Sequence, residues 1–237
     1  GVTELVTPGV AYSDNILNQK SNNYLAAVYF DKGLMGVAFC DISTGEFLVA
    51  QGSAEYIDKL LQSFKPTEIV FQKSKRSEFP ALFGDKFYTF HIDDWAFTQD
   101  YAHEVLTKHF EVNSLKGFGV DKLPAGIVAA GVVLYYLGET EHRNLQHITS
   151  ISRVEEERFM WLDRFTIRNL ELVSSSNDNG VTLFDVLDET CTPMGARLLH
   201  KWIIMPLKEL KPIQERLETV DFLVQNQALA EELLQHI

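Results

Sequence analysis

The chain has 237 residues, of which 46% are hydrophobic and 23% charged, so it can form one large globular domain or two modest ones. Its net charge is −12. The acidic excess is even: residues 1–140 carry 11 basic and 17 acidic side chains, and residues 141–237 carry 10 and 16. Because phosphate neutralisation by lysine and arginine dominates non-specific affinity for nucleic acids, so acidic a chain is a poor candidate for holding DNA by itself.

Membrane and secretory functions are also disfavoured by the sequence. The longest apolar run, residues 125–137, is shorter than the roughly 20 residues that a membrane span requires. Residues 1–4 do not resemble a signal peptide. Cys40 and Cys191 stand alone, which excludes a disulfide framework or a CxxC metal site and fits a reducing compartment. We therefore expect a cytoplasmic protein with no membrane segment.

The first 140 residues alternate strand-like and helix-like segments. Their periodicity, caps and turn residues predict antiparallel strands at 24–30, 36–40 and 47–51, a helix from a Ser53 cap to Phe64, strands at 68–72 and 87–92, and helices at 98–110 and from Pro124 to Gly138. Three antiparallel strands followed by alternating helices and strands are typical of an α/β domain with a mixed sheet. The short basic cluster Lys73-Ser74-Lys75-Arg76 follows a strand and is interpreted as a solvated turn.

From about residue 150 the pattern becomes helical. The first predicted helix spans 153–173, with an apolar stripe formed by Phe159, Leu162, Thr166, Leu170 and Val173, and a polar loop follows it up to Gly180. A second helix is predicted from a Thr192 cap to Pro206, with the stripe Met194, Leu198 and Trp202. Pro212 opens a third helix that is still running near Ile237.

Sequence motifs of common catalytic sites do not occur. No G-x-x-x-x-G-K-[ST] is present, so the phosphate cradle of an ATPase is missing, and the G-x-G at Gly117 continues to Lys122 instead of a third glycine. His91 and Asp93 could project from one side of a strand as metal ligands, but Asp93-Asp94 before Trp95 is better interpreted as a helix cap. No G-x-S-x-G nucleophile elbow is present.

Two polar sets on predicted helices have an ordinary explanation. Tyr101, Glu104 and Lys108 form a mixed face on the 98–110 helix, whose Val105, Leu106 and Phe110 can face the core. Asp163, Arg168, Asn169 and Glu171 lie off the stripe of the 153–173 helix. On composition alone, both sets are interpreted as solvated helix faces with weak charge pairs at i, i+3 or i, i+4.

Several spaced segments, taken together, carry a family resemblance over nearly the whole chain. They are Val6-Thr7-Pro8-Gly9, Ser21 to Val28, Asp41 to Phe47, Gly117-Phe118-Gly119-Val120, Leu162 to Leu172, and Leu183 to Leu187 with Gly195, Arg197-Leu198-Leu199, Trp202 and Pro206-Leu207. In this order they resemble the MutS family of bacterial DNA mismatch-repair proteins. The match is to its second, connector domain and to the beginning of its helical core or lever domain.

The resemblance implies a fold and a function. Residues 1–145 would be a ribonuclease-H-like connector with the 117–120 segment as a strand, and residues 146–237 the start of the all-α lever. The fragment would be non-catalytic, and ATP and Mg would bind only elsewhere in the full-length protein. That protein would bind mismatched duplex DNA, dimerise through a C-terminal region and act in the cytoplasm at the nucleoid. Tyr101, Glu104 and Lys108 would lie on the surface that receives the partner MutL. Asp163, Arg168, Asn169 and Glu171 would anchor the junction between the two domains.

Two alternatives remain open on the sequence. The ribonuclease-H-like fold also supports two-metal nucleases, for which Asp31, Asp41 and Glu46 are the nearest carboxylates; however, Asp31 lies in a turn, and Asp41 and Glu46 flank another. The other alternative is a MutS paralogue that acts in recombination. Such paralogues lack the mismatch-reading domain, whereas Val6-Thr7-Pro8-Gly9 suggests that such a domain precedes this segment.

Overall fold

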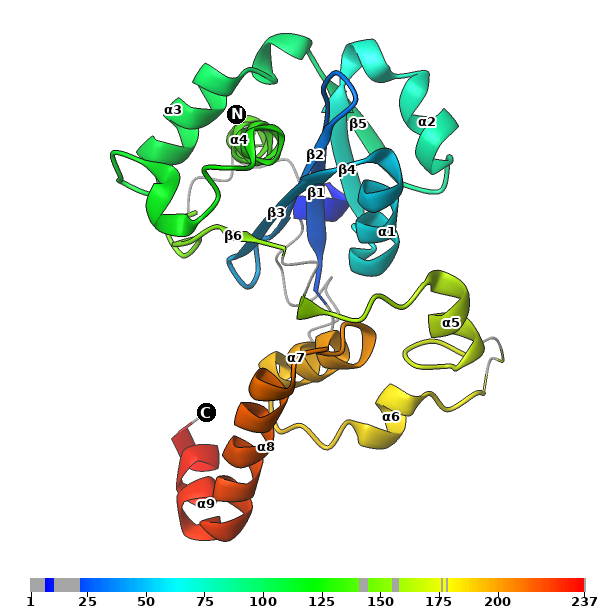
Figure 1. Ribbon diagram of the computed structural model, residues 1–237, viewed down its shortest axis with the longest axis vertical. Helices are drawn as coiled ribbons and strands as arrows, with labels where there is room; N and C mark the ends of the chain where they lie inside the picture. The colour runs from blue at the N-terminus through cyan, green and yellow to red at the C-terminus, as the bar shows by residue number, and fades with distance from the viewer. Residues whose placement is uncertain are drawn as a thin grey trace. The chain divides into compact units, whose positions relative to one another are not determined.

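The computed structural model describes residues 7–10, 22–140, 145–154, 158–175, 177 and 179–236. The chain divides into two compact units, the first ending at Val154 and the second comprising Glu155–Ile237 (Figure 1). Among the described residues, no helix combines the length and the apolar character needed to cross a membrane.

The first unit is built on a mixed sheet, as the sequence predicts. In the described part of the chain its strands are β1 (Tyr24–Phe30), β2 (Met35–Asp41), β3 (Glu46–Gly52), β4 (Glu68–Gln72), β5 (Thr89–Ile92) and β6 (Ser152–Arg153). Their spatial order is β5-β4-β1-β2-β3-β6. The β1–β2 and β2–β3 pairs are antiparallel, whereas β1–β4, β4–β5 and β3–β6 are parallel. Strand β6 was not predicted from the sequence.

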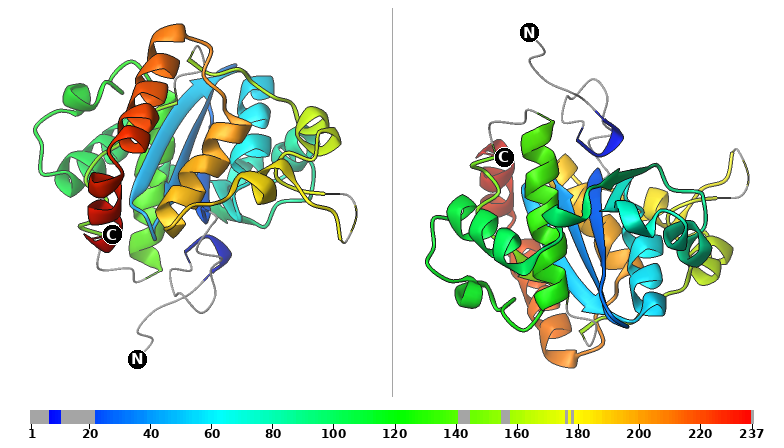
Figure 2. Two further views of the ribbon diagram at one scale, coloured as in Figure 1. Left: turned by 90° about the horizontal axis from the view of Figure 1, so that it is seen from below. Right: turned by 90° about the horizontal axis from the view of Figure 1, so that it is seen from above.

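Helices cover both faces of this sheet (Figures 1 and 2). One face is covered by α4 (Pro124–Glu139), which contacts β1, β2 and β3, and α3 (Gln99–His109) packs on α4. On the other face lie α1 (Ala54–Phe64), which is capped by Ser53 as predicted, and the short α2 (Glu78–Phe83), which was not predicted. The core therefore has two apolar layers, with α4 at the centre of one of them.

Helix α4 is buried on nearly all sides, so its fit depends on small residues at close approaches. A Cβ on Gly36 of β2 would come within 2.0 Å of the carbonyl oxygen of Ala125, so only glycine lets the helix lie this close to the sheet. The prediction that Gly138 ends α4 is wrong. The helix continues to Glu139, and the N–H of Thr140 still bonds to the carbonyl of Tyr136 at 3.0 Å.

Short 3-10 turns connect several elements of the first unit. They are η1 (Pro8–Val10), η2 (Lys73–Lys75), η3 (Asp94–Ala96) and η4 (Leu115–Phe118). The last of these replaces the strand expected at 117–120. Ser114 caps the turn by accepting from the N–H of Lys116, and Gly119 follows with φ +70°, which is incompatible with a strand.

The second unit is helical, with α5 (Arg164–Asn169), α6 (Leu183–Leu187), α7 (Pro193–Ile204), α8 (Leu210–Gln225) and α9 (Gln227–His236). Thr192 caps α7 by accepting from the N–H of Gly195 at 3.0 Å, as predicted. The third predicted helix is wrong in extent. It begins at Leu210 instead of Pro212, and Asn226 separates α8 from α9 instead of continuing one helix.

The long helix predicted over 153–173 is also wrong. Phe159 forms an antiparallel bridge with Leu207, and the N–H of Met160 donates to the carbonyl of Pro206 at 2.7 Å. Only α5 is helical, and it ends before Glu171, whose φ of +48° turns the chain out of the helix. Ile167 and Leu172 are the buried residues of this segment, whereas Leu170, assigned to the predicted stripe, is 62% exposed.

Candidate partner-binding surface

Helix α3 presents one side to the core and one to solvent. Ala102 and Leu106 are fully buried, and a Cβ on Gly131 of α4 would come within 2.5 Å of the Cα of Ala102. This close approach fixes α3 against α4. Of the three residues predicted to bind a partner, Glu104 and Lys108 are exposed and Tyr101 is half-buried. The structure therefore places this set on one surface helix.

Tyr101 belongs to an aromatic cluster that comes from three separate elements. Its ring lies edge-on to Trp95 of η3 at 5.3 Å and to Tyr135 of α4 at 6.0 Å, and Trp95 lies edge-on to Tyr135 at 5.3 Å. Edge-to-face contacts of this kind are favourable beyond the area that they bury. Trp95 nevertheless remains 55% exposed. We call Trp95, Tyr101 and Tyr135 the aromatic patch.

Carboxylates surround the aromatic patch. Burial raises the pKa of Tyr101, and the neighbouring Tyr135, Glu139 and Glu104 raise it further. Burial, Glu139 and Asp93 likewise raise the pKa of Tyr135. Both phenols therefore stay protonated at neutral pH and can donate hydrogen bonds. A surface with exposed aromatic rings and an acidic rim suits a partner that presents arginine or lysine side chains.

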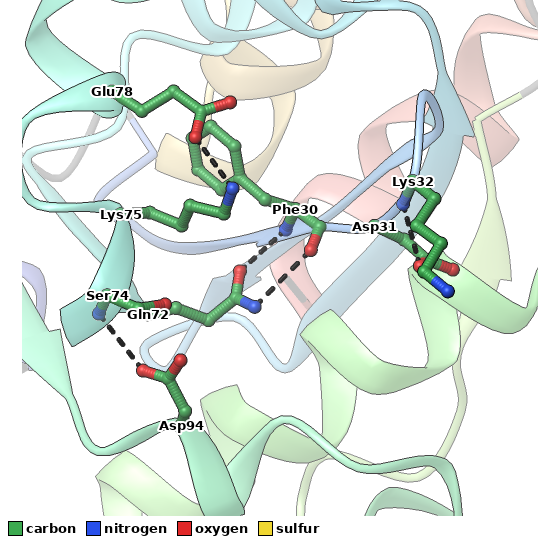
Figure 3. Close-up of polar contacts among 8 residues, drawn as sticks. All are labelled: Phe30, Asp31, Lys32, Gln72, Ser74, Lys75, Glu78 and Asp94. Atoms are coloured by element: carbon green, nitrogen blue, oxygen red, sulfur yellow. Dashed lines mark hydrogen bonds and ion pairs between the residues drawn. The ribbon is translucent and has the colours of Figure 1, made fainter.

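The loop that carries Trp95 is held by the basic turn after β4, which Figure 3 shows in part. The N–H of Ser74 donates to Asp94 at 3.0 Å, and the ammonium of Lys73 lies 2.8 Å from Asp93. Lys75 is paired with Glu78 at 2.6 Å. The prediction of a solvated turn at 73–76 is confirmed, since these lysines face carboxylates of the same unit. Asp93 occupies the cap position of η3 but makes this ion pair and no side-chain cap bond.

The buried end of the same loop is fixed by Phe97, which is buried and stacks on Tyr29 of β1 at 6.1 Å. On the opposite side of the turn, the Gln72 side chain accepts from the N–H of Phe30 at 2.7 Å and donates to its carbonyl at 3.3 Å (Figure 3). These bonds join the ends of β1 and β4. They give the exposed Trp95 a rigid support.

The carboxylates considered for a nuclease have separate local partners. Asp41 is fully buried and accepts from the side chains of Asn22 at 2.8 Å and Ser43 at 2.6 Å. Glu46 accepts from the hydroxyl of Tyr24, and Asp31 accepts from the N–H of Lys32 at 2.7 Å. Within the described residues, no group of three or more His, Cys, Asp or Glu side chains could hold a metal ion. This arrangement gives the nuclease alternative no support.

The four residues assigned to a domain junction lie in or beside α5. Asp163 caps α5 by accepting from the N–H of Thr166 at 2.7 Å, and this bond lowers the pKa of its carboxyl. Glu171 accepts from the hydroxyl of Ser175 at 2.7 Å. Arg168 and Asn169 are exposed near the end of the same helix. These contacts explain local turns of the second unit, and the junction role stays a prediction.

Sequence reasoning found Tyr101 but missed Trp95 and Tyr135. Both look ordinary in the sequence, because Trp95 lies in a turn and Tyr135 in an apolar helix. The usable signal was an aromatic residue on a turn directly after a short strand, which is where binding residues often lie. That these rings meet Tyr101 depends on the packing of α3 on α4.

A mixed, helix-covered sheet followed by a helical unit, with an exposed aromatic surface, is typical of a ribonuclease-H-like interaction module. Two family models match the chain in order: MutS domain II over residues 23–149 and MutS domain III over residues 165–237. The chain belongs to the MutS family.

Three similar relatives are each described as DNA mismatch repair protein MutS. The protein of Cytophaga hutchinsonii is 56% identical over the whole chain, which covers 28% of that relative. The protein of Christiangramia forsetii is 59% identical over 95% of the chain and 26% of the relative, and that of Flavobacterium psychrophilum is 52% identical over the whole chain and 27% of the relative. The chain thus spans about a quarter of the length of the curated relatives that it matches.

Proposed function

We propose that this chain is the connector and the beginning of the lever of a DNA mismatch-recognition protein, with residues 1–145 as the connector and residues 146–237 as the lever segment. The observation that carries the proposal is the match to MutS domains II and III, in that order, along one chain. The module performs no chemistry of its own. It transmits conformational change between the region that reads mismatched duplex DNA and the region that hydrolyses ATP with Mg.

We further propose that α3 and the aromatic patch receive a MutL-type protein. Glu104 and Lys108 supply exposed charges that fix the orientation of the partner, and Trp95 supplies exposed apolar area of the kind that is enriched in binding hot spots. The acidic rim speeds encounter with a basic partner surface. The longer protein acts on DNA in the cytoplasm, as a homodimer formed through its C-terminal region.

The junction residues fit a role in joining the domains of the longer protein. Phe165 of α5 is 77% exposed and Leu170 is 62% exposed, although both are large and apolar. We infer that other lever segments of the longer protein cover these side chains. Asp163, Arg168, Asn169 and Glu171 then set the chain direction at this junction through the cap and the turn of α5.

Charge reversal on α3 tests the docking proposal. Glu104→Lys and Lys108→Glu should each weaken binding of a purified MutL-type protein at least several-fold in calorimetry or surface plasmon resonance. Glu55→Lys is the matched control, because Glu55 is exposed on α1, on the opposite face of the sheet. Equal affinity for both α3 variants and the wild type would remove α3 from the interface.

A further inference from the structure

Glu68, the first residue of β4, is a fully buried carboxylate that the proposed docking surface does not use. Three donors surround it. Its Oε2 accepts from the hydroxyl of Thr7 at 2.5 Å and from the N–H of Gly9 at 2.9 Å, and its Oε1 accepts from the hydroxyl of Tyr136 at 2.6 Å. A buried carboxylate is tolerated only when it is hydrogen-bonded in this way.

Two of these donors belong to the short segment 7–10, which is about 60 residues away along the chain. Other bonds hold the same segment: the carbonyl of Pro8 accepts from the side chains of Asn23 at 2.9 Å and Thr67 at 3.3 Å. The fit is tight, since a Cβ on Gly9 would come within 2.7 Å of the Cβ of Glu68 and within 3.2 Å of the Cα of Leu25. Only glycine fits at this position.

A second buried carboxylate mirrors the first across the start of β1. Leu25 is paired with Glu68 on one side, and Tyr24 is paired with Asp41 on the other. Asp41 accepts from the N–H of Asn23 at 3.2 Å, and it is the Asn23 side chain that donates to Pro8. The segment 7–10 and the start of β1 are therefore held by one connected set of hydrogen bonds.

The third donor extends this set to α4. Tyr136 is buried, and the pKa of its phenol is raised by burial and by the bond to Glu68, so the phenol remains a donor. Its neighbour in sequence, Tyr135, is part of the aromatic patch. The carboxylate of Glu68 thus lies between the segment 7–10 and the helix that supports the proposed docking surface.

We propose that Glu68 is a positioning residue: it latches the segment 7–10 onto β4 and α4, and so couples the chain that leads into the connector to the aromatic patch. This inference rests on the proposed function only in its last step, the effect on the partner. Glu68 and the segment support each other, because release of the segment leaves the buried carboxylate with Tyr136 as the one remaining donor of the three.

Hydrogen exchange of the 237-residue chain tests the latch directly. The amide of Gly9 is itself a donor to Glu68, and Pro8 has no amide, so peptides covering residues 7–10 report on this bond. Thr7→Val removes one donor at the same volume, and Glu68→Gln removes the charge. We expect exchange at Gly9 to become about tenfold faster or more in both variants. Glu78→Gln, which alters an exposed carboxylate paired with Lys75, should leave it unchanged.

Unchanged exchange at Gly9 in Thr7→Val and Glu68→Gln would overturn the latch. If Glu68→Gln unfolds the first unit, Thr7→Val decides the question, since it leaves the carboxylate with two donors. The coupling step is tested by the affinity of the MutL-type protein for Thr7→Val, which should fall several-fold; unchanged affinity together with faster exchange overturns the coupling. Absence of binding to the wild type would instead overturn the proposed function and leave the latch intact.

Discussion

Gly131 of α4 lies so close to α3 that a side-chain Cβ at this position would approach the Cα of Ala102 to 2.5 Å. The absence of a side chain at one position of α4 therefore sets the distance between the two helices. Tyr101, Glu104 and Lys108 keep their position only if that distance is kept. The proposed docking surface thus depends on a residue that does not belong to it.

Gly131→Ala should therefore displace α3 and destabilise the first unit by about 1–3 kcal/mol, the usual cost of overpacking a close-packed interior. Urea unfolding followed by circular dichroism measures this loss. Gly138→Ala is the matched control on the same helix, because a Cβ there has no atom within 4 Å, and it should be neutral or stabilising by up to about 1 kcal/mol. Equal stability of the two variants would show that α3 can shift without cost.

The aromatic patch makes a second prediction. Trp95→Ala should lower the affinity for a MutL-type protein by about tenfold or more, since exposed tryptophans at interfaces are frequent hot spots. It should cost little stability, because Trp95 is already 55% exposed. Leu82→Ala, on the opposite face of the sheet and 47% exposed, serves as the control in the same binding titration. A loss of affinity in the Leu82 variant equal to that in the Trp95 variant would argue against a localised patch.

Asp41→Asn distinguishes a structural carboxylate from a catalytic one. The carboxylate of Asp41 accepts from Asn22, Asn23 and Ser43, so an amide in its place would turn a donor toward donors. We expect a loss of about 1–3 kcal/mol in the free energy of unfolding. The exposed Asp31→Asn should cost much less. Metal-dependent cleavage of nucleic acid by the wild type, abolished in a fully stable Asp41→Asn, would favour the nuclease alternative.

The sequence predicted those parts of the fold in which local signals agree. The strand 24–30, the turn at Asp31-Lys32-Gly33 and the cap at Ser53 each have their own residue pattern, and the structure has them at these places. The helix over 153–173 failed because the pairing of Phe159 with Leu207 spans 48 residues, and a helical period carries no information about such a partner.

The same limit applies to the candidate sites. Glu68 looks like a polar residue at the start of a strand, and only the distant Thr7 and Gly9 explain its burial. Trp95 and Tyr135 meet Tyr101 through the packing of α3 on α4, which no local spacing specifies. Chain positions that are far apart in sequence are therefore the part that sequence reasoning could not supply.

The caps of α5 and α6 make a prediction about pH. The N–H of Thr166 holds the pKa of Asp163 below its ordinary value of 3.8, and bonds from Thr182 do the same for Asp185. A carboxyl whose pKa is lower in the folded state stabilises that state above its unfolded pKa, and the contribution is lost as the pH falls through the folded pKa. Both caps should therefore be complete at neutral pH and weaken below about pH 4.

Amide chemical shifts measured by NMR from pH 7 to pH 2.5 check this prediction. The amide of Thr166 should titrate with a midpoint below 3.8 in the wild type, since it donates to Asp163. In Asp163→Asn the same amide should not titrate, because asparagine caps a helix about as well as aspartate but does not ionise in this range. A midpoint at or above 3.8, or a titration that persists in the asparagine variant, would mean that Asp163 does not cap α5 in solution.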